Sequence, residues 1–526
     1  MSESKKEKKE LDQIVKSNGH LQISRRQFMG NASLGTIGYV AMPSFLNLLT
    51  QSATAAECGL SNVVNNDRVV FMIFDLAGGP SINAALLPGT VEGDKESFRN
   101  AGGNMAKRGA AISTVTSGNE VNLTRAFGGT MWALHPFTQS LMAATSEKAK
   151  LSTDFFVINS VTDDDYSGIL DDRVSAHSSP ANMLAQVAPA GRIFKGVGTF
   201  ANLSGTYQAA PSGSRKGAYS FVKVSSPTDI QNALKSGALV ANLGATKASQ
   251  VWDSLKNLNN SQVDFLNGRS LASESKDIIE CMNVGGKSIN LDFNVTSPTV
   301  FPSTTTDTDL AQVFSNFNTN NFEKQLGTMA HLLANGNASG AAIAVAGGDY
   351  HTLGQAYIEN YDRTAGDAIG KTIEYFTRKN IKAFIVTIQD GGIVTDFSAL
   401  NGTTGRTNPA GDDLSGTIHS VWVVNPTSPI VTATSSQTRT LASKSALLAD
   451  ATTQSRQIGM ITTGADVNGN GAGGLGRSAT MSAQAIVANY LVAAGIDPTP
   501  HGAMLNLLGA DPTKISSTYI KLKKMV

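Results

Sequence analysis

The sequence predicts an α/β fold built on a mostly parallel sheet, and three apolar runs carry this prediction. The runs at 68–75, 341–346 and 382–388 lack polar alternation, which is typical of strands buried on both faces. Helical patterns at 322–336 and 356–380 precede the second and the third run. Such alternation of helix and strand indicates parallel strands joined by right-handed crossovers.

Candidate metal ligands follow each of these runs. Asp75 ends the first run, Asp349 and His351 follow the second, and Asp390 follows the third. The carboxyl ends of parallel strands meet at one edge of the sheet, where ligands bind in open α/β folds. Asp349 and His351 stand two positions apart, so in extended chain their side chains point the same way. We therefore expect a shared metal site. The alternative is that the aspartates cap turns or helices and that His351 is a surface residue.

Further elements are expected on both sides of this core. They are a helix at 134–150, strands at 155–161 and 421–424, and a closing helix at 478–494. His419 stands just before the second of these strands and is a further candidate ligand. The pattern between 191 and 315 is mixed and predicts a mainly helical insertion or subdomain. His331 is expected to be a structural residue of its helix.

A group of polar side chains precedes another short helix that is expected after Pro180. Ser175, His177 and Ser178 bring two hydroxyls and an imidazole to its amino end, where anions are favoured. His177 is therefore a candidate ligand or anion-binding residue. The alternative is a hydrogen-bonded structural histidine.

The first 56 residues are expected to be a twin-arginine export signal. A charged head leads to Arg25 and Arg26, and residues 27–56 carry no charge. Glycine and proline dilute the apolar part, which makes it a poor membrane span, and the small residues Ala53–Ala56 offer a cleavage site. The alternative is an uncleaved anchor. Residues 57–526 are then the mature protein, a single large domain carried by the Tat translocase to the periplasm or the outside of the cell.

The net charge limits the partners that the protein can attract, and the two cysteines bear on the redox state of its cellular compartment. Residues 1–56 hold seven Lys/Arg and four Asp/Glu, so their removal changes the formal net charge from +1 to −2. No basic excess remains to attract nucleic acid. Cys58 and Cys281, the two cysteines of the chain, would enter an oxidising compartment, where they either form one disulfide or stay free.

One stretch has part of a calcium-loop pattern. Asp466–Asn470 matches its first half, but Arg477 occupies the position that needs a bidentate glutamate. A glycine-rich loop without calcium is expected there.

Six short blocks resemble, in the same order, blocks of a family of exported bacterial proteins. They are Gly78–Ser81, Leu134–Pro136, Ala176–His177, Asp349–His351, Gln389–Gly392 and Gly416–His419. That family carries a twin-arginine signal, is sulfatase-like and is similar to the alkaline phosphatase superfamily of metal-dependent hydrolases. The resemblance spans roughly residues 67–495. It implies a three-layer α/β/α sandwich with a mostly parallel central sheet.

The resemblance also implies a ligand set and a reaction. The implied metal ligands are Asp75, Asp349, His351, Asp390 and His419, with His177 nearby. Mixed carboxylate and imidazole ligands suit one or two Zn²⁺ or Mn²⁺ ions, which activate phosphate or sulfate esters for hydrolysis.

Three departures from the family pattern support an alternative reading. Ala176 replaces a serine before the histidine, so Ser175 or Ser178 would have to act as nucleophile. The block after Asp390 lacks the family's arginine, and Ile418 and Ser420 flank His419 where the family has aspartate and glycine. The alternative is a catalytically degenerate member of the fold that acts as a periplasmic or envelope-associated binding or structural protein.

Overall fold

The structure, a computed structural model, describes a little over a third of the chain. The described residues are 68–76, 82–86, 123–129, 131–161, 184, 187–188, 191, 194–199, 222–234, 298, 300–345, 355–389, 400–401, 405–406, 416–427, 457–459, 479–496, 522 and 525. The chain divides into two compact units, one of residues 1–55 and 234–286 and one of residues 56–233 and 287–526. The sheet and the helices packed on it belong to the second unit.

The elements follow one another along the chain as strands and helices. The strands are β1 (Val69–Leu76), β2 (Leu123–Thr124), β3 (Met131–Trp132), β4 (Thr153–Val161), β5 (Phe194–Gly198), β6 (Val222–Lys223), β7 (Ala338–Ala344), β8 (Lys382–Gln389), β9 (Leu400–Asn401), β10 (Gly405–Arg406), β11 (Gly416–Val424) and β12 (Gln457–Ile458). The helices are α4 (Ile82–Ala85), α6 (Pro136–Ala143), α7 (Glu147–Leu151), α9 (Pro227–Leu234), α12 (Thr308–Val313), α13 (Asn321–Ala334), α14 (Gln355–Arg378) and α15 (Ala479–Ala493).

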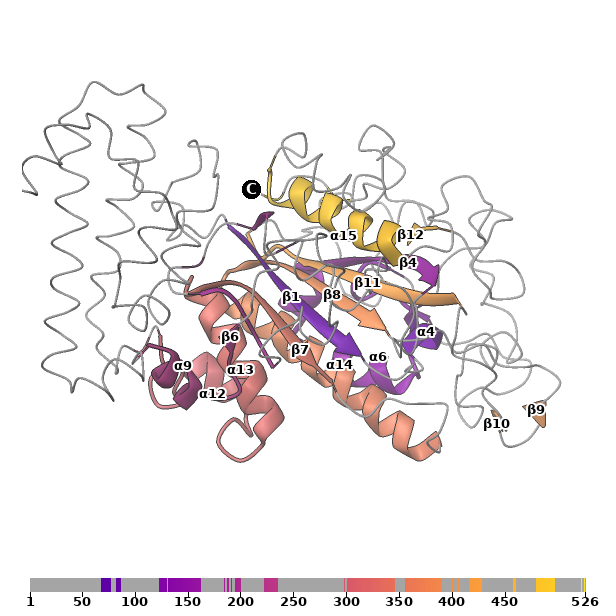
Figure 1. Cartoon of the computed structure of the whole chain (residues 1–526). Coiled ribbons are helices and arrows are strands. Elements are labelled where there is room, and N and C mark those ends of the chain that lie inside the picture. Colours follow the sequence, from indigo (N-terminus) through magenta and orange to yellow (C-terminus); the bar gives the residue numbers. More distant parts are fainter. Residues whose placement is uncertain are drawn as a thin grey trace, which may run out of the picture. The chain divides into compact units, whose positions relative to one another are not determined.

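Eight strands form one mixed, mostly parallel sheet, which confirms the α/β class. Their order is β12-β4-β11-β8-β1-β7-β5-β6 (Figure 1). β1 pairs in parallel with β7 and β8, β5 with β7 and β6, and β12 with β4. Within this sheet β11 alone runs antiparallel to its neighbours, β4 and β8. The sequence predicted the parallel strands but not the reversed one.

Alternate residues of β1 pack on opposite faces of the sheet, which explains its unbroken apolar run. Val69, Phe71 and Ile73 belong to a buried cluster that includes most of the apolar residues of α15. Tyr490 of α15 meets the Phe71 ring edge-on at 6.0 Å, and its hydroxyl donates to Val69 O at 2.9 Å. In Figure 1, α15 lies above the sheet.

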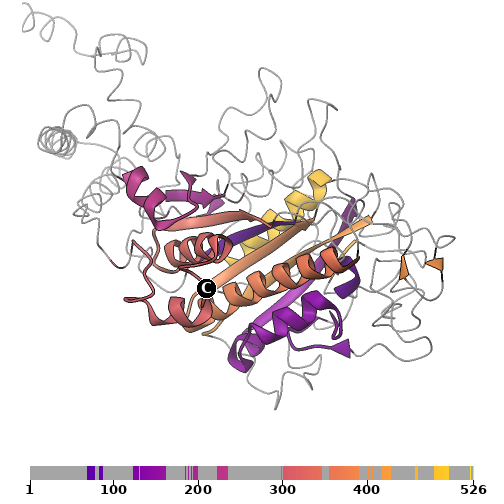
Figure 2. The same cartoon turned by 90° about the horizontal axis from the view of Figure 1, so that it is seen from below.

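The helices α6, α13 and α14 lie below the sheet in Figure 1, and α6 and α14 run side by side in Figure 2. Gly366 of α14 lets these two helices approach closely, because a Cβ there would lie 2.2 Å from Phe137 O of α6. Phe137 also reaches Trp422 of β11, which stacks on Phe155 of β4 at 4.4 Å between ring centroids. This aromatic cluster joins α6 to β4 and β11.

The single helix predicted at 134–150 is two helices. α6 ends at Ala143, and Ser146 then starts α7 by accepting a hydrogen bond from Ala149 N at 3.2 Å. The Ser146 N–H in turn donates to Glu374 of α14 at 2.8 Å. A carboxylate far away in the sequence therefore stabilises the break, which local helix propensity could not reveal.

The strand and insertion boundaries also differ from the prediction. β7 begins at Ala338, three residues before the predicted run. Within the range predicted as an insertion, β5 and β6 are strands of the main sheet, and residues 234–286 form part of the other compact unit. The glycine-interrupted sequence of β5, Phe194–Gly198, lacks the apolar run that marks the other strands, which is why it resembles a loop.

The helices α13 and α14 end within two residues of the predicted positions. Gly336 follows α13 with φ of 78°, and Asn380 follows α14 with φ of 56°, the left-handed conformation that ends many helices. Asn320 caps the start of α13 by accepting from Phe322 N and Glu323 N. Among the described residues, no helix is long and apolar enough to cross a membrane.

Candidate functional site

The strand order brings the predicted ligand-bearing strands together. β7, β1, β8 and β11 are neighbours in the sheet. Asp75 stands near the carboxyl end of β1, and Asp349 and Asp390 follow β7 and β8 along the chain. Val345, the residue after β7, donates its N–H to Asp75 O at 2.8 Å and accepts from the Tyr361 hydroxyl at 2.7 Å. Val345, which precedes Asp349 in the chain, is therefore hydrogen-bonded to both β1 and α14.

Asp75 and His419 lie on one row across three neighbouring strands. Asp75 pairs with Ile388 of β8, and Ser420 pairs with Thr387, so antiparallel pairing sets His419 opposite Ile388. Because paired residues point to the same face, all three side chains lie on the α15 face of the sheet. At roughly 4.8 Å between strands, the Cα atoms of Asp75 and His419 are roughly 10 Å apart.

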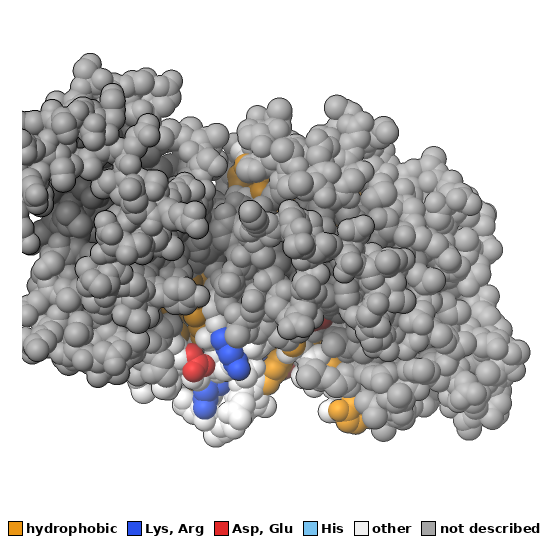
Figure 3. Space-filling view, in the orientation of Figure 1, with side chains coloured by type: hydrophobic (Ala, Val, Ile, Leu, Met, Phe, Trp, Pro, Cys, Tyr) orange, Lys and Arg blue, Asp and Glu red, His pale blue; other side chains and the backbone are white. Residues whose placement is uncertain are grey.

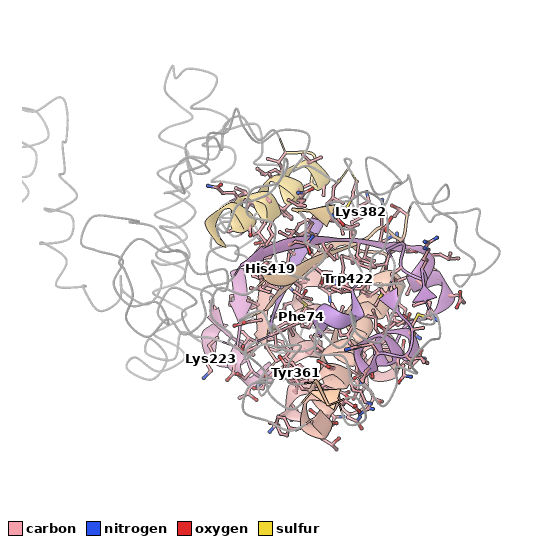
Figure 4. All side chains as sticks on the ribbon, turned by 90° about the vertical axis from the view of Figure 1, so that its right-hand side faces the viewer. Phe74, Lys223, Tyr361, Lys382, His419 and Trp422 are labelled. Carbon is pink, nitrogen blue, oxygen red and sulfur yellow. The ribbon has the colours of Figure 1, made fainter. Side chains whose placement is uncertain are left out.

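His419 reaches this edge because β11 is reversed. The sequence pattern predicted that His419 precedes a strand. In the structure it is the fourth residue of β11 and pairs with Ile158 of β4. At the start of a parallel strand it would lie at the opposite edge of the sheet. His419, labelled in Figure 4, is fully buried, and Ile388 is buried between it and the half-buried Asp75.

A buried hydroxyl pair fixes β11 on β8 next to His419. The Ser420 N–H donates to Thr387 Oγ1 at 3.1 Å, and the two hydroxyl groups share a further short hydrogen bond. Trp422 Nε1 donates to Ser420 Oγ at 2.8 Å. These bonds lie on the face of the sheet opposite to His419, since side chains alternate along a strand.

The other predicted site residues lie outside the described residues. These are Ser175, His177, Ser178, Asp349, His351 and Asp390, together with Cys58, Cys281, the 466–477 loop and the signal at 1–56. Within the described ranges, no three His, Cys, Asp or Glu side chains gather closely enough to hold a metal ion. The described part of the site is therefore one carboxylate and one imidazole.

A buried histidine–aspartate pair, which the sequence did not indicate, joins α6 to α14. His135 Nδ1 accepts from Phe137 N–H at 3.2 Å and so caps α6. The hydrogen of a neutral ring then stands on Nε2, which lies 3.9 Å from Asp362 Oδ2. Side-chain exposure is 1% for His135 and 0% for Asp362. The sequence analysis placed His135 at the start of a helix and in one of the six resembling blocks, but gave it no partner.

A second buried cluster, which we call the Asp307 cluster, joins α12, α13 and α14. Asp307 accepts hydrogen bonds from Tyr375 at 2.8 Å and from Leu310 N at 3.0 Å, and it pairs with Lys379 at 2.9 Å and with His331 at 3.1 Å. Burial by itself raises the pKa of Asp307, but these hydrogen bonds outweigh it and hold that pKa well below its usual range. Burial and the Asp307 charge raise the pKa of Tyr375. His331 is confirmed as a structural residue of α13.

The charged surface around this cluster is mixed in sign. Figure 3 shows Lys or Arg side chains next to Asp or Glu side chains on this face, in the part that α12 and α13 occupy. Lys371 of α14 pairs with Glu323 of α13 at 2.9 Å and with Asp367 at 2.7 Å. The pair with Glu323 joins α14 to α13, whereas Asp367 lies one turn before Lys371 on α14. Among the described residues, positive and negative side chains are therefore mixed here.

Comparisons of the chain with family models, with curated proteins and with solved structures give no match.

Proposed function

We propose that the protein is an exported, sulfatase-like hydrolase of phosphate or sulfate esters that depends on a divalent metal. Its fold would be the three-layer α/β/α sandwich of the alkaline phosphatase superfamily. The mostly parallel sheet, with helices against it, supports this architecture.

One observation carries the proposal. Asp75 and His419, 344 positions apart in the sequence, stand on one row and one face of the sheet. Asp349, His351 and Asp390 follow strands that adjoin this row. Two imidazoles and three carboxylates are a donor set that Zn²⁺ or Mn²⁺ accepts, so the residues fit the implied metal. Since Ile388 separates Asp75 from His419, the five groups would converge beyond the end of β8.

Each residue has a defined part in the proposed reaction. Asp75, Asp349, His351, Asp390 and His419 would hold the metal, which supplies positive charge for the transferring phosphoryl or sulfuryl group. Ser175 or Ser178 would act as the nucleophile, or would position a water in that role. His177 would bind the anionic group of the substrate at the start of a helix.

Metal content of the purified exported protein tests this proposal. Two equivalents of zinc or manganese, together with hydrolysis of p-nitrophenyl phosphate or sulfate, are expected. Protein that holds no metal after growth and purification in supplemented medium would contradict the hydrolase. That result would instead favour the degenerate binding or structural protein, which is the second candidate.

His351→Ala should lower the melting temperature only when metal is present. A metal bound to the folded state alone stabilises it by mass action, by about 2.7 kcal/mol at a hundredfold excess over Kd. Thermal melts of wild type and variant, each in zinc and in chelator, measure this. His331→Ala is the matched control, because its deficit should be equal in both buffers. An equal deficit for His351→Ala would exclude it as a ligand.

Replacing Arg25 and Arg26 together by lysine should block export. The proposed signal depends on the arginine pair rather than on positive charge, since lysine keeps the charge. Fractionation and blotting would find the double variant in the cytoplasm with its first 56 residues intact. Normal amounts in the periplasm would contradict the twin-arginine assignment.

A further inference from the structure

Tyr361 joins the two ends of the connection between β7 and α14, which carries two of the proposed metal ligands. Residues 346–354 are this connection in the sequence, and Asp349 and His351 lie within it. Tyr361 stands in the second turn of α14. Its hydroxyl donates to the carbonyl oxygen of Val345, the residue just before the connection, at 2.7 Å. One hydrogen bond therefore links the start of the connection to the helix that follows it.

This hydrogen bond is shielded from water. Tyr361, which Figure 4 labels, is 4% exposed, and Val345 is 2% exposed. Water therefore has little access to replace the hydroxyl as a donor. A buried carbonyl that loses its donor keeps the cost of its own desolvation, so the position of Val345 depends on the phenol hydroxyl.

The same chain end is also held by both neighbouring strands. The Val345 N–H donates to Asp75 O of β1 at 2.8 Å. Ala344, the last residue of β7, donates its N–H to the hydroxyl oxygen of Thr199, just after β5, at 3.1 Å. β1 and β5 are the two neighbours of β7 in the sheet. Groups from three elements therefore fix the point at which the chain leaves β7.

This point lies beside one proposed ligand and close in sequence to two others. Asp75 accepts the Val345 N–H through its own backbone carbonyl, and Asp349 and His351 follow Val345 by four and six positions. Bonds to Zn²⁺ are about 2 Å long and tolerate deviations of about 0.2 Å. A small displacement of Val345 relative to Asp75 would therefore separate ligands that must meet at one ion.

We propose, on the basis of the metal site proposed above, that Tyr361 is a positioning residue for the metal ligands. Its hydroxyl holds the start of the connection, so that Asp349 and His351 meet Asp75 with a smaller loss of chain entropy when metal binds. Tyr361 acts through the Val345 carbonyl and is not itself a ligand. Its removal should therefore weaken metal binding more than it weakens the fold.

Tyr490 provides a matched control within the same sheet. Its hydroxyl donates to Val69 O at 2.9 Å, and its side chain is fully buried. Val69 begins β1, at the edge of the sheet opposite to the proposed site. Tyr361→Phe and Tyr490→Phe therefore remove the same kind of hydrogen bond, one at each edge of the sheet.

The zinc affinity of the purified exported protein tests the proposal. Competition with a zinc-binding dye should give a dissociation constant about tenfold higher for Tyr361→Phe than for wild type, because residues that orient metal ligands change affinity by about 10–100-fold. Tyr490→Phe should bind zinc as wild type does. In chelator, both variants should melt at similar temperatures below that of wild type, since each loses one buried hydrogen bond.

Thr199→Val tests the same chain end without a change in α14. It removes the acceptor of the Ala344 N–H and should also raise the zinc dissociation constant. Unchanged zinc affinity in Tyr361→Phe and Thr199→Val, with zinc bound by wild type, would overturn the positioning role and leave the proposed hydrolase standing. An equal loss of affinity in Tyr490→Phe would assign the effect to stability and overturn the positioning role as well. A wild-type protein that binds neither zinc nor manganese would overturn both proposals.

Discussion

Gly340→Ala is expected to lower the free energy of unfolding by about 1–3 kcal/mol, although it adds a single methyl group. A Cβ at Gly340 of β7 would lie 1.9 Å from Cζ of Phe71 on the paired strand β1. Phe71 is fully buried, and Tyr490 meets its ring edge-on at 6.0 Å. The ring therefore has little room to move away, and the strain falls on the centre of the sheet.

A double-mutant cycle identifies the cause of this loss. Phe71→Ala alone should cost about 3–5 kcal/mol through the cavity that it leaves. Combined with Gly340→Ala, the added methyl enters that cavity, so the double variant should be more stable than the sum of the single effects by about 1–3 kcal/mol. Urea denaturation of the four proteins measures the coupling. Strictly additive losses would show that the Phe71 ring is not the obstacle.

Asp307→Asn is expected to cost about 3 kcal/mol at pH 7. Asparagine keeps the size and the helix-capping oxygen of Asp307, so the loss comes from the negative charge that Lys379 and His331 face. Removing one partner of a buried pair costs about 3–5 kcal/mol, and the low end applies because the Lys379 side chain is 28% exposed. Asp309→Asn is the matched control. Asp309 pairs with the same lysine but is 31% exposed, so a change below about 1 kcal/mol is expected.

The stability difference between wild type and Asp307→Asn should shrink in acid. Because the pKa of Asp307 is lowered in the folded protein, its stabilisation is complete above the ordinary aspartate value of about 3.9 and is lost as the pH falls below it. The pKa values of Glu323 and Glu374 are also lowered, but both proteins share those residues, so they cancel in the comparison. Urea denaturation at pH 6, 5, 4 and 3 measures the difference. A constant difference at all four values would contradict the assigned role of the Asp307 charge.

Patterns within single segments predicted most of the main elements. The apolar runs became β1, β7 and β8, and the helical patterns became α13, α14 and α15, because burial on both faces or on one stripe leaves a local signature. The same patterns missed β5, whose glycines hide its burial, and joined α6 to α7, whose separation is stabilised by Glu374. Segments whose structure depends on distant partners carry no such signature.

The sequence by itself determined the α/β class, the strand that bears Asp75, the strand that follows His419, and the helix that contains His331. Only the tertiary structure decided that β11 runs antiparallel beside β8, and this direction is what sets His419 on the row of Asp75. It also decided that Gly340 lies under the Phe71 ring and that Pro298 and Asp307 flank His331. Strand order, strand direction and buried hydrogen bonds arise between segments far apart in the chain. A local pattern reports how a residue is buried, and not which distant residue buries it.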